Sequence, residues 1–293
     1  MPSINCHITV IMGTIIHHYT NIDVLALILK NRTLRFTRLD QVDDPEESIF
    51  ISNGVNLGPY TFVSCWTECK EESIPMWRMY TRGEWGIRLS FERDGLFKTY
   101  IDHAYKGHGT DITEVGEEIH FLFDPKLKWN QTDYTPPFLT DDYDKSHFYR
   151  KIEYVDDITP YANDCVKKLS LREDNMSITI DFDKVGSYKN KRWAFQEESR
   201  FVIFLMPGNP YASLNSPNHF QEQKRIIKDI INNKEIGFSH YDMSLSEEAF
   251  EHLVITMSPS CDTAQRVLVE SLCEKYAPKA RIVDSHLMGK LAK

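Results

Sequence analysis

The sequence predicts a single α+β domain over 1–293. The length exceeds the usual size of one hydrophobic core only slightly. With 41% hydrophobic and 12% aromatic residues, the chain has enough apolar material to build that core. Strand-like and helix-like segments are mixed along the chain, and no repeats or low-complexity tracts occur. These observations exclude a disordered chain and favour a globular domain that contains both kinds of element.

The first third of the chain is expected to mix strands with short helices. A buried strand over 8–20 precedes an amphipathic helix over 22–30, with Asn21 as its N-cap. Alternating apolar and polar residues predict a strand over 34–39, which ends at an acidic turn. Further along, the pattern predicts strands over 60–66 and 85–91 and, between them, a short helix over 73–80.

A polar, proline-containing stretch over 124–146 predicts a long loop insertion within the domain. The last part of the chain then returns to regular elements. The predicted strands are 148–155, 198–205, 253–257 and 281–287, and the predicted helices are 164–171, 220–232 and 262–276.

The net charge and the cysteines limit the possible partners and the compartment. The chain has 34 Lys and Arg against 43 Asp and Glu, a net charge of −9, which disfavours adhesion to nucleic acid or anionic lipid by bulk charge. The most apolar N-terminal stretch is too short for a membrane span and unlike a signal peptide. The six cysteines show neither a disulfide framework nor zinc-ligand spacing. We therefore expect a cytoplasmic protein without a membrane partner.

Two histidines, His17 and His18, end the first predicted strand and are followed by Tyr19 and Thr20. Successive side chains of a strand point to opposite faces, so only one histidine faces a given cleft, and His18 shares its face with Thr20. A lone histidine is more often structural than functional. The strand end is therefore a weak site candidate by itself.

Aromatic residues gather around the short predicted helix. Met76 and Tyr80 lie four residues apart on one helical face with Trp77 beside them, which is typical of core packing. However, Trp66, Trp77 and Trp85 place three of the five tryptophans within 20 residues. Such a π surface can sandwich a nicotinamide, an adenine or another base, which favours a ligand site.

The segment 193–200 leads into a predicted buried strand. On an extended chain, Gln196, Glu198 and Arg200 lie on one face. Three polar side chains at the mouth of a buried strand are costly unless they bind each other or a ligand. Two interpretations remain open, a structural pair of Glu198 with Arg200 and a functional site.

The turn Asp43-Asp44-Pro45-Glu46 is a candidate metal site because it brings three carboxylates together. Neighbouring carboxylates on a turn are more often solvated, and no histidine is near in the sequence. We therefore predict no metal ligands.

Four motifs make the chain resemble a bacterial family catalogued as domain of unknown function 2971. They span 15–287 and stand as His18-Tyr19-Thr20, Asp43-Asp44-Pro45-Glu46, Met76-Trp77-Arg78-Met79-Tyr80 before a strand with Gly86, and 193–200. Gln196 stands where that family usually has its first Glu, so the chain departs from the pattern of two carboxylates.

A second resemblance is to the ADP-ribosyltransferases, including the DNA-modifying toxins. The first-strand histidine, the helix 25–31, the aromatic middle segment and the late-strand Gln-x-Glu are similar to their His-Tyr-Glu pattern. In such enzymes the His holds a ribose of NAD, the Tyr stacks on nicotinamide, and the Glu stabilises charge as the glycosidic bond breaks. The resemblance assigns these roles to His18, Tyr80 and Glu198. It also implies a split, mostly antiparallel sheet with flanking helices.

These resemblances imply an NAD-dependent ADP-ribosyltransferase-like enzyme, a toxin or antiviral defence effector that modifies nucleic acid or protein. The expected catalytic residues are Glu198, Gln196 and Tyr80, and the expected NAD-binding residues are His18, Tyr19, Thr20, Trp77 and Arg200. One alternative, favoured by Gln196, is a non-catalytic nucleotide or nucleic-acid sensor that uses the aromatic cleft. Another is a metal-dependent nuclease that uses Asp43, Asp44 and Glu46.

Overall fold

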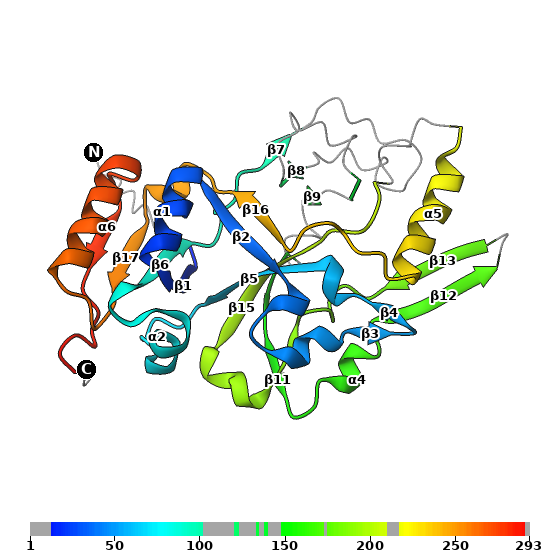
Figure 1. The fold of residues 1–293 in the computed structure, drawn as a ribbon, viewed down its shortest axis with the longest axis horizontal. Coiled ribbons are helices and arrows are strands. Elements are labelled where there is room, and N and C mark those ends of the chain that lie inside the picture. The colour runs from blue at the N-terminus through cyan, green and yellow to red at the C-terminus, as the bar shows by residue number, and fades with distance from the viewer. Residues whose placement is uncertain are drawn as a thin grey trace, which may run out of the picture.

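The computed structural model describes residues 13–101, 120–122, 133–134, 138–139, 148–172, 175–209 and 217–290. These residues form an α+β fold in which helices flank a mixed, mostly antiparallel sheet (Figure 1). The strand order is β10-β15-β5-β1-β6-β17-β18, and β2 with β16 branches from β5. The predicted fold class is confirmed at this level.

The main sheet is built from nine strands of the described residues. In chain order they are β1 (Ile15–Asn21), β2 (Thr33–Arg38), β5 (Thr61–Thr67), β6 (Gly86–Glu92), β10 (Tyr149–Lys151), β15 (Glu198–Phe204), β16 (His240–Ser244), β17 (Val254–Met257) and β18 (Arg281–Val283). Among these nine strands, only β17 and β18 form a parallel pair.

The remaining strands form smaller sheets, and helices flank the main sheet. The small sheets are formed by β3 (Ile51–Ser52), β4 (Val55–Asn56), β7 (Tyr100–Ile101), β8 (His120–Phe121), β9 (Phe138–Leu139), β11 (Glu153–Val155), β12 (Val166–Arg172), β13 (Asn175–Ile180) and β14 (Tyr188–Asn190). The helices are α1 (Ile22–Asn31), α2 (Ile74–Tyr80), α4 (Thr159–Ala162), α5 (His219–Ile231) and α6 (Thr263–Tyr276). Two 3-10 helices matter below, η2 (Pro45–Ile49) and η7 (Lys191–Gln196).

The main sheet is split at β5. At one end of β5, Thr67 pairs with His17 of β1, and at the other end Phe62 and Val63 pair with β2. Between these points no described strand pairs with that side of β5, whereas β15 pairs with the other side along the whole strand. The sheet is therefore open beside 64–66.

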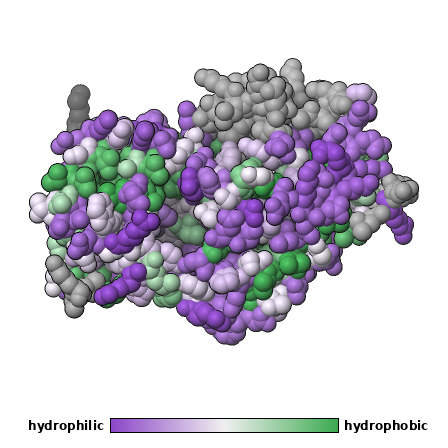
Figure 2. Space-filling view, viewed as in Figure 1, coloured by the Kyte–Doolittle hydropathy of each residue, from purple (hydrophilic) through white to green (hydrophobic). Residues whose placement is uncertain are grey.

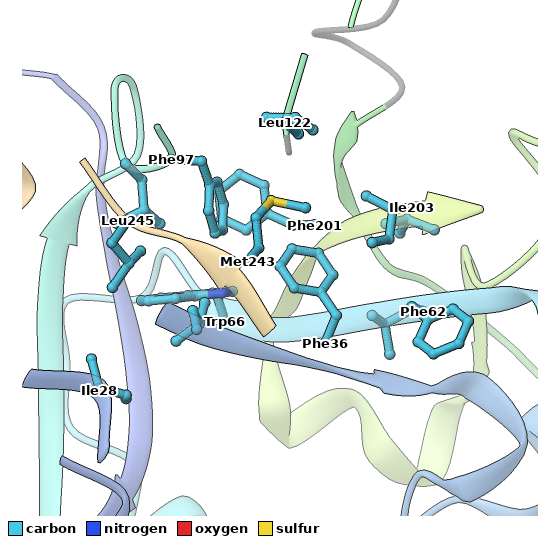
Figure 3. Close-up of a cluster of buried hydrophobic side chains, with 14 of the residues drawn as sticks. Ile28, Phe36, Phe62, Trp66, Phe97, Leu122, Phe201, Ile203, Met243 and Leu245 are labelled. Carbon is cyan, nitrogen blue, oxygen red and sulfur yellow. The ribbon is translucent and has the colours of Figure 1, made fainter. Parts of the chain in front are cut away.

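One face of the sheet is apolar and carries the core. Directly opposed residues of an antiparallel pair share a face, so the pairing of Ile16 with Phe91 and of Ile255 with Leu89 defines an apolar surface. Aromatic side chains of other strands continue this core, among them Phe36, Phe62, Trp66 and Phe201 (Figure 3). Burial of such side chains stabilises the fold by about 1.5–3 kcal/mol each.

The other face is polar near the split. The register places His17 beside Thr67 and Thr67 beside Glu198, so the three residues form a row across β1, β5 and β15. Arg88 of β6 and Arg200 of β15 also belong to this face. Helix α2 lies over it, as shown by the edge-on contact of its Trp77 with Tyr19 of β1.

Most predicted elements occur within one or two residues of their expected bounds, but the helix predicted over 164–171 is wrong. These residues instead contain β12, which forms a hairpin with β13 from Val166 to Arg172. Leu169 and Leu171 alternate with polar residues, a pattern that suits a strand, and short segments are ambiguous between the two periods. The pairing with β13 supplies the backbone hydrogen bonds that decide for the strand.

Other predictions need correction in their bounds. The strand predicted over 148–155 is two strands, β10 and β11, which pair with β15 and β14 in different sheets. The strand predicted over 281–287 ends at Val283. Strand β1 begins at Ile15, with 13 and 14 outside it and 8–12 outside the described residues. Asn21 precedes α1 as predicted, but its side chain does not cap the helix, because its Oδ1 accepts from the backbone N–H of Arg82 at 2.6 Å. The predicted insertion over 124–146 lies outside the described residues except for 133–134 and 138–139.

The face shown in Figure 2 is largely polar, and an apolar patch lies on it over α1 and α6. Its exposed members are Leu27 of α1 and Val267 and Leu268 of α6. Among the described residues, no helix has both the length and the apolarity that crossing a bilayer requires.

Candidate functional site

A pocket lies at the split in the sheet, and aromatic residues form one side of it. Its volume is about 70 Å³, room for roughly five water molecules. Strand β1 contributes His18 and Tyr19, β5 contributes Trp66, and α2 contributes Met76 and Tyr80. The split allows residues from both faces of the sheet to reach one cavity.

His18 is fixed by a hydrogen bond across the split. Its Nδ1 donates to the backbone carbonyl of Cys65 at 2.8 Å, and its ring lies 5.2 Å from that of Trp66. Because a carbonyl only accepts, Nδ1 carries the proton and Nε2 of the neutral ring is an acceptor. Burial lowers the pKa of His18, although the bond to Cys65 partly opposes this shift. His18 is therefore neutral at neutral pH.

Tyr80 is the last residue of α2, and the start of this helix is defined by an N-cap and a proline. The Ser73 side chain accepts from the N–H of Met76 as an N-cap, and Pro75 occupies the first turn, where its missing N–H costs nothing. At the other end of α2, the Tyr80 hydroxyl donates to Asp43 and accepts from the Gln196 amide. Burial and the neighbouring Asp43 raise the pKa of Tyr80, which keeps the hydroxyl protonated.

Gln196 and Glu198 share the pocket for a different reason from the predicted one. The sequence predicted one extended face, but Gln196 ends the 3-10 helix η7 and Glu198 begins β15. Between them, Glu197 has φ 43° and ψ 49°, a left-handed conformation that is uncommon outside glycine. This turn directs both neighbours into the pocket while Glu197 stays exposed.

Glu198 belongs to a buried network of four charges. Its Oε2 accepts from Lys189 Nζ at 3.0 Å, and its Oε1 accepts from Arg200. Arg200 also donates to both carboxylate oxygens of Glu47, with Nη2 at 2.8 Å from Oε2. Lys189 Nζ lies 3.3 Å from Glu47 and 2.8 Å from the amide oxygen of Gln196. Two carboxylates therefore balance two cations.

The network sets the protonation of the pocket. Burial alone raises the pKa of Glu198, but the charges of Arg200 and Lys189 outweigh it and lower that pKa, so the carboxylate is ionised. Burial lowers the pKa of Arg200, but the charges of Glu198 and Glu47 outweigh this effect and raise that pKa well above its usual value. Burial raises the pKa of the Cys65 thiol well above its usual value, so it is not a thiolate at neutral pH.

Three predicted binding residues do not line the pocket. Thr20 lies opposite Ile87 on the apolar face, and Trp77 is buried, where its Nε1 donates to Glu72 at 2.9 Å. Arg200 is fully buried behind Glu198. Their expected contact with NAD is therefore not supported by position, whereas His18, Tyr19, Tyr80, Gln196 and Glu198 do lie together.

The acidic turn is less solvated than predicted. Asp44 is buried, and its Oδ1 accepts from the N–H of Glu46 at the start of η2. The next carboxylate, Glu47, is also buried and belongs to the charge network. Within the described part of the chain, no group of three His, Cys, Asp or Glu side chains could hold a metal ion.

Sequence reasoning missed three residues of this region. Glu47 follows the acidic motif directly, but its burial depends on Arg200, which lies 153 positions further on. Lys189 has no local motif and is placed by β14, which pairs with β11. His17 lines the pocket beside His18, and only the register of β1 with β5 shows that it shares a face with Glu198.

Comparison with known proteins gives no match, since no family model, curated protein or solved structure is similar to the chain. The two resemblances drawn from the motifs stay predictions.

Proposed function

We propose that the pocket binds the nicotinamide end of NAD and that the protein is an ADP-ribosyltransferase-like enzyme. The observation that carries this proposal is that His18, Tyr80 and Glu198, which are far apart in the sequence, line one small cavity. A cavity of about 70 Å³ cannot hold a whole dinucleotide, so only one end of NAD is proposed to enter it. The ring of Trp66 supplies an apolar wall for it.

The chemistry of Glu198 fits bond cleavage at the nicotinamide ribose. When nicotinamide leaves with the bonding electron pair, the ribose carbon develops positive charge. An ionised, buried carboxylate stabilises that transition state more than the ground state. Each Glu198 oxygen accepts one bond in the network, and a carboxylate has about four acceptor positions, so acceptor capacity is left for a ribose hydroxyl.

The neighbouring residues have supporting roles in the proposal. His18 Nε2 is an acceptor for a ribose hydroxyl, because its Nδ1 is committed to the Cys65 carbonyl. Gln196 does not exchange protons, so it orients an acceptor and does not act as a base. Its amide is held by Lys189 and Tyr80. An acceptor on nucleic acid or protein supplies the electron pair for the new bond and loses a proton to solvent.

A non-catalytic nucleotide sensor is the second candidate. It is favoured by the pairing of both Glu198 oxygens with cations, at Lys189 and Arg200, because such a carboxylate is also suited to a purely structural role. A sensor binds nucleotide in the pocket and leaves it intact.

The deciding experiment incubates the protein with labelled NAD, cell extract and nucleic acid, and then separates modified protein, DNA, RNA and free ADP-ribose. We expect label in one of the products and a loss of roughly 10² to 10³ in rate for Glu198→Gln. Glu197→Gln is the matched control, because this neighbouring carboxylate is exposed, and it should keep the wild-type rate.

Glu198→Gln also weakens the charge network, so its melting temperature is measured on the same preparation. Glu198→Asp keeps the negative charge but moves it back by one methylene group. This variant should stay folded and consume NAD more slowly. Wild-type NAD consumption by a folded Glu198→Gln protein would overturn the enzyme proposal. Binding of NAD without any consumption would favour the sensor.

A further inference from the structure

A second polar cluster lies on the same face of the sheet, on β1 and β6, and β5 separates it from the strand β15 of the charge network. It contains His17 of β1 and Arg88 of β6, whose side chains are only 7% and 8% exposed. His17 Nε2 and Arg88 Nε are both buried without a hydrogen-bond partner among the described residues. Buried polar nitrogens normally have a partner, and a lost one costs about 1–3 kcal/mol. Two such nitrogens close together call for an explanation.

The positive charge of Arg88 is the more unusual feature. Arg88 Nη1 donates to the backbone carbonyl of Lys70 at 3.1 Å, and its guanidinium lies 5.9 Å from the centre of the Tyr19 ring. Among the described residues, no carboxylate forms an ion pair with Arg88. A buried cation without a counter-charge is costly, so the surroundings of Arg88 are suited to an anion.

The two nitrogens belong to neighbouring positions of one ladder. Ser90 lies opposite His17 and Arg88 lies opposite Tyr19 on the antiparallel pair β1–β6. His17 and Arg88 are therefore diagonal neighbours, whose Cα atoms are about 7–8 Å apart and whose Cβ atoms are somewhat closer. The Ser90 hydroxyl lies 2.7 Å from His17 Nδ1. When that hydroxyl donates to Nδ1, Nε2 carries the proton and is a second N–H donor beside the guanidinium.

We propose that His17 and Arg88 form a phosphate-binding subsite for a nucleotide whose ring occupies the pocket. His17 links the two, since it lines the pocket and lies beside Arg88. Adjacent strands are about 4.8 Å apart, a spacing that one ribose bridges. The Arg88 guanidinium is a charge-matched donor for a phosphate oxyanion, and the N–H of the neutral His17 ring adds a second hydrogen bond. The subsite rests on the proposed function only for the identity of the ring in the pocket.

The test uses pyrophosphate in phosphate-free buffer as the probe, with the melting temperature and calorimetric binding as readouts. We expect millimolar pyrophosphate to raise the wild-type melting temperature by a few degrees. Arg88→Met and His17→Gln should each weaken pyrophosphate binding about tenfold or more. Arg82→Met is the matched control, because Arg82 is a nearby arginine with an exposed side chain, and it should change binding less than about twofold.

The outcomes separate the subsite from the proposed function. Pyrophosphate binding that depends on His17 and Arg88 supports the subsite even if NAD is never consumed. The subsite would be overturned if the wild-type protein did not respond to pyrophosphate, or if the variants bound it like wild type, even if NAD is cleaved. In that case water would be the partner of both nitrogens. If Arg88→Met fails to fold, Arg88→Lys keeps the charge but not the Nε donor, and unchanged binding by that variant would also contradict the proposal.

Discussion

Two buried arginines on one face of the main sheet have opposite surroundings. Arg200 lies between two carboxylates, Glu47 and Glu198, and Lys189 completes a balanced set of charges. Arg88 lies two strands beyond β5 with a backbone carbonyl and an aromatic ring as its neighbours. In the first cluster the charges balance, whereas among the described residues no carboxylate forms an ion pair with Arg88. Buried charge therefore supports the fold in the first cluster and, in our proposal, binds phosphate in the second.

The largest expected effect comes from breaking the complete cluster. Glu47→Gln removes the carboxylate that Arg200 contacts with two nitrogens, and should lower the free energy of unfolding by about 3–5 kcal/mol, because it leaves a buried charge under-compensated. Urea denaturation measures this loss. Glu46→Gln is the control, since its ion pair with Arg192 is partly exposed and should contribute less than about 1 kcal/mol. Equal losses in the two variants would contradict the distinction.

Acidification should act on the second cluster. Burial, with a smaller contribution from Arg88, lowers the pKa of His17 from 6.5 to about 4. Below pH 6.5 His17 is therefore protonated in the unfolded chain but not in the folded protein. The free energy of unfolding then falls as the pH decreases towards 4. Between pH 7 and 5 the loss is about 2 kcal/mol.

His17→Gln tests this pH dependence, because glutamine does not titrate. The difference in unfolding free energy between wild type and variant should shrink as the pH falls from 7 to 5. Parallel pH profiles for the two proteins would mean that His17 stays unprotonated in both states or titrates normally.

The smallest expected effect has the opposite sign to the first. Arg88→Met replaces an uncompensated buried cation with an apolar chain of similar length, so in phosphate-free buffer the free energy of unfolding should stay level or rise by about 1 kcal/mol. Arg200→Met, measured in parallel, should lose several kcal/mol because two carboxylates remain buried. A comparable loss in both variants would remove the contrast between the clusters.

The sequence predicts the elements of this fold better than the side-chain partners. Alternation and capping signals locate β5, α2 and β15, because their determinants are local. The sequence also suggests a pair of Glu198 with Arg200, since two residues of one strand separated by a single position share a face. The rest of the site depends on contacts that no local pattern encodes.

Three examples show the limit. Glu47 looks solvated in an acidic turn until Arg200 is brought to it by the pairing of β15 with β5. Gln196 reaches the pocket because the backbone of Glu197 is left-handed, a conformation that a glutamate in the sequence does not predict. The choice between His17 and His18 depends on the register of β1, and a one-residue change in register exchanges the faces.

The order of the strands has a consequence for synthesis on the ribosome. The long edge of β5 pairs with β15, whose first residue, Glu198, lies opposite Thr67 although about 130 positions separate them. At a translation rate of about 5–20 residues per second, the ribosome needs roughly 7 to 26 s to add those residues. Throughout that interval the backbone N–H and C=O groups on this edge of β5 lack their strand partner and can pair with other chains. The proposed active carboxylate arrives only when that edge is covered, so an unfinished chain has no working pocket.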